Sequence, residues 1–175
     1  MSWLLLTYRL PAEPSSARVA VWREVRRSGA LQVQQSVVAF PDTDDFRPAL
    51  ARVRAVVADV GGSAIAVSAE PLEPDDDERL VSAWNDARAA EYAELAAESA
   101  KLVAEIDKEF AKEKFTLAEL DEEEAELDKL ERWRERIRTR DVHGCEGAAS
   151  AEAALERAAD ALARYTTAVF DRTHG

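Results

Sequence analysis

The feature that most constrains the fold is a long stretch without glycine, between Gly62 and Gly144. It follows the segment Pro71-Leu-Glu-Pro74-Asp-Asp-Asp-Glu78, in which two prolines interrupt regular structure and an acidic cluster suits the start of a helix. The chain is therefore expected to divide into residues 1–72 and residues 73–175, and the second part is expected to be nearly all helix.

The second part carries two apolar stripes at helical spacing, one before and one after Lys114. Between them, Thr116-Leu-Ala-Glu119 is a capping box that starts a new helix. This predicts a long antiparallel hairpin over about 75–139 that turns at 114–116, followed by a last helix over about 150–170. The stripes are Leu80, Trp84, Leu95, Leu102, Ile106 and Phe110, then Leu117, Leu120, Leu127, Leu130 and Ile137, and in the last helix Leu155, Leu162, Tyr165 and Val169.

The first part alternates between strand and helix patterns. Strands are expected at 3–9, 30–33, 36–40 and 63–70. One helix covers 15–28, started by Ser15 or Ser16 and stopped by Gly29, and another runs from a cap at Asp42 or Thr43 to Gly61-Gly62. The order βαββαβ predicts an α+β, ferredoxin-like antiparallel sheet. The alternative is a three-strand sandwich in which residues 30–40 form one bent strand.

Charge is unevenly distributed over the 175 residues, whose net charge is −12. Residues 1–70 hold eight arginines and seven acids, whereas residues 71–175 hold fifteen basic and twenty-eight acidic residues. The balance argues against a chain that binds nucleic acid over its whole surface. Cys145 is the one cysteine, no secretory signal pattern opens the chain, and the apolar run at 3–6 is too short to cross a bilayer. We expect a cytoplasmic protein that does not enter a membrane.

The arginines near the N-terminus fall into two groups when the helix over 15–28 is projected at 100° per residue. Arg18 lies in its first turn, where the helix dipole disfavours a cation. Either an oxyanion held with Arg9, or a carboxylate from Glu13, Asp42 or the helical part, would remove this conflict. Arg23, Arg26 and Arg27 lie opposite the apolar face, as a solvated surface or as a strip that contacts phosphates. That apolar face comprises Ala17, Val21, Val25 and Ser28.

No residue pattern supports catalysis, a cofactor or a metal. His143 and Cys145 lie in one loop, but a zinc site needs about four ligands and a nucleophile needs an oriented base. The acids between Glu119 and Asp128 are typical of a solvated helix face. We therefore expect that the chain is not an enzyme.

Some apolar residues of the helical part lie off the main stripes, namely Val81, Val103 and Trp133. They are expected to pack against the chain's own sheet or against a second copy, so a homodimer formed through the hairpin is one expectation.

Five segments together resemble the N-terminal domain of the chromate resistance protein ChrB, and the likeness covers nearly the whole chain. The most distinctive reads Pro14-Ser-Ser-Ala-Arg18-Val-Ala-Val-Trp22-Arg23-Glu-Val-Arg-Arg-Ser-Gly29-Ala. The others are Trp3-Leu-Leu-Leu, Val37-Val-Ala-Phe-Pro41, Trp84-Asn-Asp-Ala-Arg88-Ala-Ala-Glu91-Tyr92-Ala-Glu-Leu and Arg138-Thr-Arg140-Asp141.

The resemblance implies a bacterial cytoplasmic protein of chromate resistance, whose longer relatives regulate transcription of efflux genes and carry a second, C-terminal domain. It places Arg18, Trp22 and Arg23 in the part associated with nucleic-acid or anion contact, and Arg88, Glu91 and Tyr92 in the helical part. Because no such second domain follows in this chain, a separate protein partner is expected to supply it.

Three functions follow as hypotheses. The first is a regulatory module that binds DNA through the arginine-rich first part. The second is a protein-interaction module that acts through the acidic hairpin. The third is a binder of a small oxyanion, chromate or sulfate, at Arg9 and Arg18.

Overall fold

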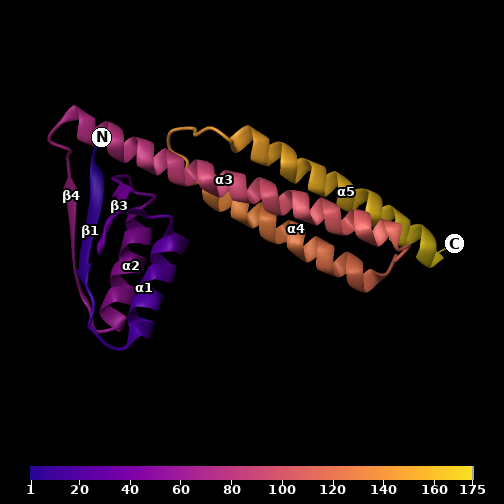
Figure 1. Cartoon of the computed structure of the whole chain (residues 1–175), viewed down its shortest axis with the longest axis horizontal. Coiled ribbons are helices and arrows are strands. Elements are labelled where there is room, and N and C mark those ends of the chain that lie inside the picture. The colour runs from indigo at the N-terminus through magenta and orange to yellow at the C-terminus, as the bar shows by residue number, and fades with distance from the viewer. Residues whose placement is uncertain (175) are drawn as a thin grey trace. The chain divides into compact units, whose positions relative to one another are not determined.

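The computed structural model of the chain describes residues 1–174. Its first part is built on a four-stranded antiparallel sheet, and Figure 1 labels three of the strands, β1, β3 and β4. The strands lie in the order β2-β3-β1-β4. Their bounds are β1 Trp3–Arg9, β2 Leu31–Gln34, β3 Val37–Pro41 and β4 Ser63–Ala69. With two interleaved helices the element order is β1α1β2β3α2β4, which confirms the predicted fold class. The bent-strand alternative is wrong, because a turn with Ser36 at φ 66° separates β2 from β3.

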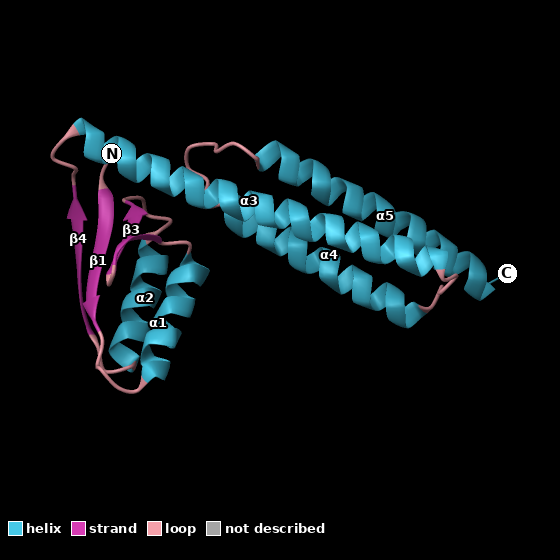
Figure 2. Ribbon diagram, in the orientation of Figure 1, coloured by secondary structure: helices cyan, strands magenta, loops and turns pink. Residues whose placement is uncertain are grey.

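Both interleaved helices, α1 Ser15–Ser28 and α2 Arg47–Asp59, cover the same face of this sheet (Figure 2). Strand alternation directs Leu4 and Leu6 to that face, opposite Phe40 and Val38 of β3. The apolar face predicted for α1 is confirmed, with Gly29 as a left-handed C-cap at φ 72°. The buried helix residues that meet the strands include Val21, Val25, Val53 and Val57.

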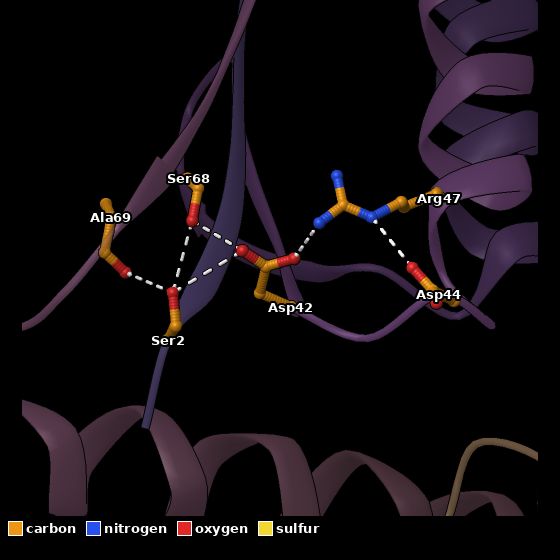
Figure 3. A network of polar contacts seen from close by, with 6 residues as sticks. All are labelled: Ser2, Asp42, Asp44, Arg47, Ser68 and Ala69. Atoms are coloured by element: carbon orange, nitrogen blue, oxygen red, sulfur yellow. Dashed lines mark hydrogen bonds and ion pairs between the residues drawn. The ribbon is translucent and has the colours of Figure 1, made fainter.

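The two helix starts differ from the predicted caps. Helix α1 begins at Ser15, but its N-cap is Pro14 and no side chain accepts a hydrogen bond there. Helix α2 begins at Arg47 after an uncapped Phe46, so the cap predicted at Asp42 or Thr43 is wrong. The Asp42 carboxylate is used elsewhere: it accepts hydrogen bonds from the hydroxyls of Ser2 and Ser68 and from Arg47 (Figure 3).

Three long helices follow, α3 Pro74–Ala111, α4 Leu117–Arg138 and α5 Ala148–His174. The predicted hairpin and last helix are confirmed, and α5 is longer than the pattern indicated. Thr116 caps α4, since its hydroxyl accepts a hydrogen bond from the backbone N–H of Glu119 at 3.3 Å. The chain forms two compact units, Met1–Trp84 and Asn85–Gly175, and the division falls within α3.

The helical unit has its own hydrophobic core, to which all three helices contribute. Buried side chains of α5 complete it, and Val103 and Trp133 are partly buried against it. Three residues assigned to the hairpin stripes do not pack there: Leu80 and Trp84 pack in the core of the first unit, and Leu117 is exposed. The central members of the helical core are Leu95, Leu102, Ile106, Leu120, Leu130, Ile137, Leu155, Leu162 and Tyr165.

None of the helices over residues 1–174 combines the length and the apolar character needed to span a bilayer.

Candidate functional site

The exposed side of α1 presents an aromatic ring beside a cation. Trp22 is 52% exposed, although a large apolar ring normally gains by burial. The guanidinium carbon of Arg26, one turn further along, lies 5.1 Å from the centre of that ring, which is a cation–π distance. Arg23, which follows Trp22 in the sequence, is exposed as well. The helix therefore offers a ring face and two permanent positive charges to solvent.

A buried carboxylate organises two more arginines at the α1–α2 contact. Glu24 is only 5% exposed. It forms an ion pair with Arg27 of its own helix, and its Oε1 lies 3.6 Å from Nε of Arg52 on α2. One negative charge thus faces two guanidinium groups, which leaves a net positive charge at this contact. Arg52 was missed by sequence reasoning, because helix periodicity does not show which residue of α2 faces Glu24.

Together these side chains form an arginine face, defined here as Trp22, Arg23, Arg26, Arg27 and Arg52. The two helices that carry it are basic overall, since α1 and α2 contain seven arginines, four of them in the arginine face, and only two acids, Glu24 and Asp59. This contrasts with the chain as a whole, whose net charge is −12. The face can attract an anion or an acidic surface that the rest of the protein repels.

Arg9 and Arg18, the two arginines of the predicted oxyanion site, lie outside the arginine face, and their surroundings differ. Nη1 of Arg18 donates a hydrogen bond to the backbone carbonyl of Ala12 at 2.8 Å. The positive charge of Arg18 at the start of α1 is thus compensated by a carbonyl oxygen of the preceding loop, and not by one of the carboxylates expected from the sequence. Arg9, at the end of β1, lines an open hollow of about 200 Å³ with Leu10, Pro11 and residues 61–63. Arg18 does not line that hollow.

The helical motif residues form a polar cluster of their own. Arg88 on α3 is 2% exposed and pairs with Glu91 at 3.2 Å. The same Glu91 oxygen also lies 3.4 Å from Nη1 of Arg140, which is 49 residues away in the sequence. Burial lowers the pKa of Arg140, and the Glu91 carboxylate opposes that change. Two segments that carry the family likeness, 84–95 and 138–141, therefore meet in space.

A second part of this cluster ties down the loop before α5. The hydroxyl of Tyr92 donates to Asp141 at 3.4 Å, and the backbone N–H of Cys145 donates to the other oxygen of the same carboxylate at 2.9 Å. Burial, with the Asp141 charge as the next cause, raises the pKa of Tyr92 to about 12 and that of the Cys145 thiol to about 11. Both groups are neutral at neutral pH, so the arrangement is suited to holding the loop and not to nucleophilic chemistry.

Among the side chains that the structure describes, His, Cys, Asp and Glu do not gather in groups of three or more that could hold a metal ion. His143 is exposed in the loop, two residues before the half-buried Cys145.

Comparison with known proteins places these features in one family. No curated protein matches the chain. The family model described as protein ChrB, N-terminal, matches residues 18–175. That range includes the arginine face and the polar cluster, whereas β1 and Arg9 precede it. Because the match covers most of the chain and includes all three long helices, the chain belongs to the ChrB N-terminal domain family.

Proposed function

We propose that this chain is a non-enzymatic regulatory module of the chromate response that binds DNA through its arginine face. The observation that carries the proposal is the exposed pair of Trp22 and Arg26 on a helix with further exposed arginines. Guanidinium groups neutralise backbone phosphates and release counterions, which supplies most of the affinity of non-specific DNA binding.

The dimensions of α1 suit this role. It has 14 residues, so it extends about 21 Å, and the major groove is about 12 Å wide and accepts a helix. Arginine is also the side chain that most often reads guanine in that groove. The exposed Trp22 ring adds an apolar surface for sugar or base contact at the same place. Acidic helices elsewhere in the chain restrict DNA to the arginine face by repulsion.

We assign the chain no reaction, cofactor or metal. Its one thiol, Cys145, has a raised pKa and is therefore protonated at neutral pH, which makes it a weak nucleophile.

Fluorescence anisotropy of labelled promoter duplexes, repeated over a series of salt concentrations, tests the proposal. We expect affinity to fall steeply with salt, and the double variant Arg23→Ala/Arg26→Ala to bind more weakly with a salt slope smaller by about 2. Trp22→Ala should weaken binding with little change in that slope.

The matched control is Arg132→Ala, which removes a 65% exposed arginine from α4 and should leave DNA binding unchanged. Binding that does not depend on salt, or an equal loss in the control variant, would contradict the role of the arginine face.

A second candidate function is favoured by the acidic surface of the helical unit. Burial raises the pKa of Glu123, and the charges of Glu105 and Glu119 raise it further. Carboxylates that repel one another are stabilised when a basic partner approaches. This surface therefore suits a protein partner such as a separately made C-terminal domain of the family. Calorimetry with that domain should give a heat of binding that Glu122→Gln/Glu123→Gln reduces and Arg23→Ala/Arg26→Ala does not.

A further inference from the structure

Strand β4 is an unusually open sheet edge. It pairs with β1 in regular register over all seven of its residues, Ser63-Ala-Ile-Ala-Val-Ser-Ala69, and within residues 1–174 no strand pairs with its other side. Natural edge strands are usually short, bulged, or marked by a charge or a proline, which prevents pairing with another chain. The opposite edge follows this rule, because β2 has only four residues and an irregular register. Strand β4 has none of these protections.

The side chains of β4 indicate what could pair with it. Ile65 and Val67 lie on the face away from α1 and α2, and they are 66% and 48% exposed. Ala64 and Ala66 lie on the helix-covered face and are half-buried. A strand added at this edge would partly cover both β-branched side chains while it satisfies the free backbone groups.

We propose that a second copy of this chain pairs with β4 in antiparallel register about Ala66, joining two four-stranded sheets into one. The strand is nearly self-complementary about that residue. Ile65 would face Val67 of the partner subunit, and Ala64 would face Ser68 of the partner subunit. Cross-strand pairs of β-branched residues are among those that stabilise a sheet.

Charge also favours a second copy over an unrelated strand. The interior of β4 has no ionisable side chain, so like charges do not meet at the two-fold axis even though each chain carries −12. The ends are complementary: Arg9 lies beside Ser63 at one end, and Glu70 follows Ala69 at the other. Antiparallel pairing brings the Arg9 end of one copy to the Glu70 end of its partner.

The apolar residues from which a hairpin dimer was expected are less suited to forming the dimer interface, because they pack within the chain itself. Val103 and Trp133 are partly buried in the core of the helical unit, and Val81 packs in the first unit. The dimer expected from the sequence is therefore assigned to the sheet edge instead of the hairpin.

Sedimentation equilibrium at micromolar concentrations of the full chain tests the pairing and its register. Ile65→Lys and Val67→Glu, each alone, should raise the dimer dissociation constant by about tenfold or more, because a charge then faces an apolar side chain twice in each dimer. A mixture of the two variants should dimerise like the wild type, since the introduced ammonium and carboxylate face each other only in the proposed register.

Circular dichroism of each variant checks that the monomer stays folded, which is expected because both positions are exposed. Leu117→Lys, at a 61% exposed position of α4, is the matched control and should not affect the dimer. The proposal is overturned if the wild-type chain stays monomeric, if the single variants dimerise normally, if their mixture does not recover, or if only Leu117→Lys dissociates the dimer. These outcomes do not depend on whether the arginine face binds DNA.

Discussion

At the scale of single residues, the polar cluster around Glu91 shows how burial changes the value of an ion pair. Arg88 and Arg140 are both largely removed from water, with side chains 3% and 11% exposed, and both contact the same carboxylate. A buried ion pair contributes little when intact, but removing one partner leaves a charge in a poorly solvating environment. Losing one member of this cluster should therefore cost more stability than losing one member of an exposed ion pair in the helical unit.

Neutralising the shared carboxylate should expose this difference. We expect Glu91→Gln to lower the free energy of unfolding by about 2 kcal/mol or more, because two buried guanidinium groups then share no carboxylate at that position. Glu135→Gln breaks an exposed pair with Arg138 on α4 and should barely change stability. Urea denaturation of both variants measures the difference, and equal effects would contradict a structural role for the buried pair.

The tyrosine of the same cluster predicts a loss of stability in alkali. Because the pKa of Tyr92 is raised from 10.0 to about 12 on folding, the phenol is neutral in both states below pH 10. As the pH rises from 10 through 12, the unfolded chain ionises first, and stability falls by up to about 1.4 kcal/mol per pH unit. Tyr92→Phe should remove this contribution from the curve of unfolding free energy against pH.

The thiol of Cys145 also makes stability fall as the pH rises, but over a lower pH range than Tyr92. Its pKa is raised from 9.0 to about 11, so its share of stability is lost between those values. Cys145→Ser therefore provides the comparison. It should flatten the curve of unfolding free energy against pH between about pH 9 and 11, whereas Tyr92→Phe should flatten it between about pH 10 and 12. A Tyr92→Phe curve that follows the wild type above pH 10 would be incompatible with a hydroxyl that stays buried.

At the scale of elements, α5 owes its place in the helical core to small side chains. Ala151, Ala154, Ala158 and Ala161 are all buried, with Ala158 and Ala161 completely inaccessible. Small residues on a helix face let a neighbouring helix approach closely, so the alanine-rich sequence is itself a packing signal. The larger side chains of the helix, Leu155, Leu162 and Tyr165, then fill the space between α3 and α4.

This packing predicts that the same substitution has a large effect at one position of α5 and a small effect at another. Ala158→Leu should lower the free energy of unfolding by about 1 to 3 kcal/mol, because no space is left at that contact. Ala163→Leu, at an exposed position, should change it by less than about 0.5 kcal/mol. Thermal unfolding distinguishes them, and comparable destabilisation at both positions would show that α5 is not positioned by its alanines.

Elements were predictable from the sequence where periodicity decides them, and contacts between distant segments were not. The strand over 3–9 and the face containing Val21 and Val25 follow from local rules, as does the Thr116 cap. The site was predictable only in part: the exposed arginines of α1 were found, but the Glu24–Arg52 contact and the Glu91–Arg140 contact were not. Those pairs depend on how two elements meet, which leaves no repeating signal in the sequence.

At the scale of the whole molecule, the two units have separate hydrophobic cores that share no buried residue, although α3 belongs to both. Three of the four tryptophans lie in the first unit, and two of them, Trp3 and Trp84, are almost completely buried there. Most residues of the three long helices lie in the second unit. Tryptophan fluorescence therefore reports mainly on the first unit, and far-ultraviolet circular dichroism mainly on the second.

Core substitutions should consequently separate the two signals. Val53→Ala removes buried methyl groups of the first unit and should lower the fluorescence midpoint more than the dichroism midpoint. Leu95→Ala removes buried methyl groups of the second unit and should lower the dichroism midpoint more than the fluorescence midpoint. The expected loss in the free energy of unfolding is about 2 to 5 kcal/mol. If each variant instead shifted both midpoints equally, the continuous helix α3 would couple the units into one cooperative transition, and the two cores would have to be treated as a single folding unit.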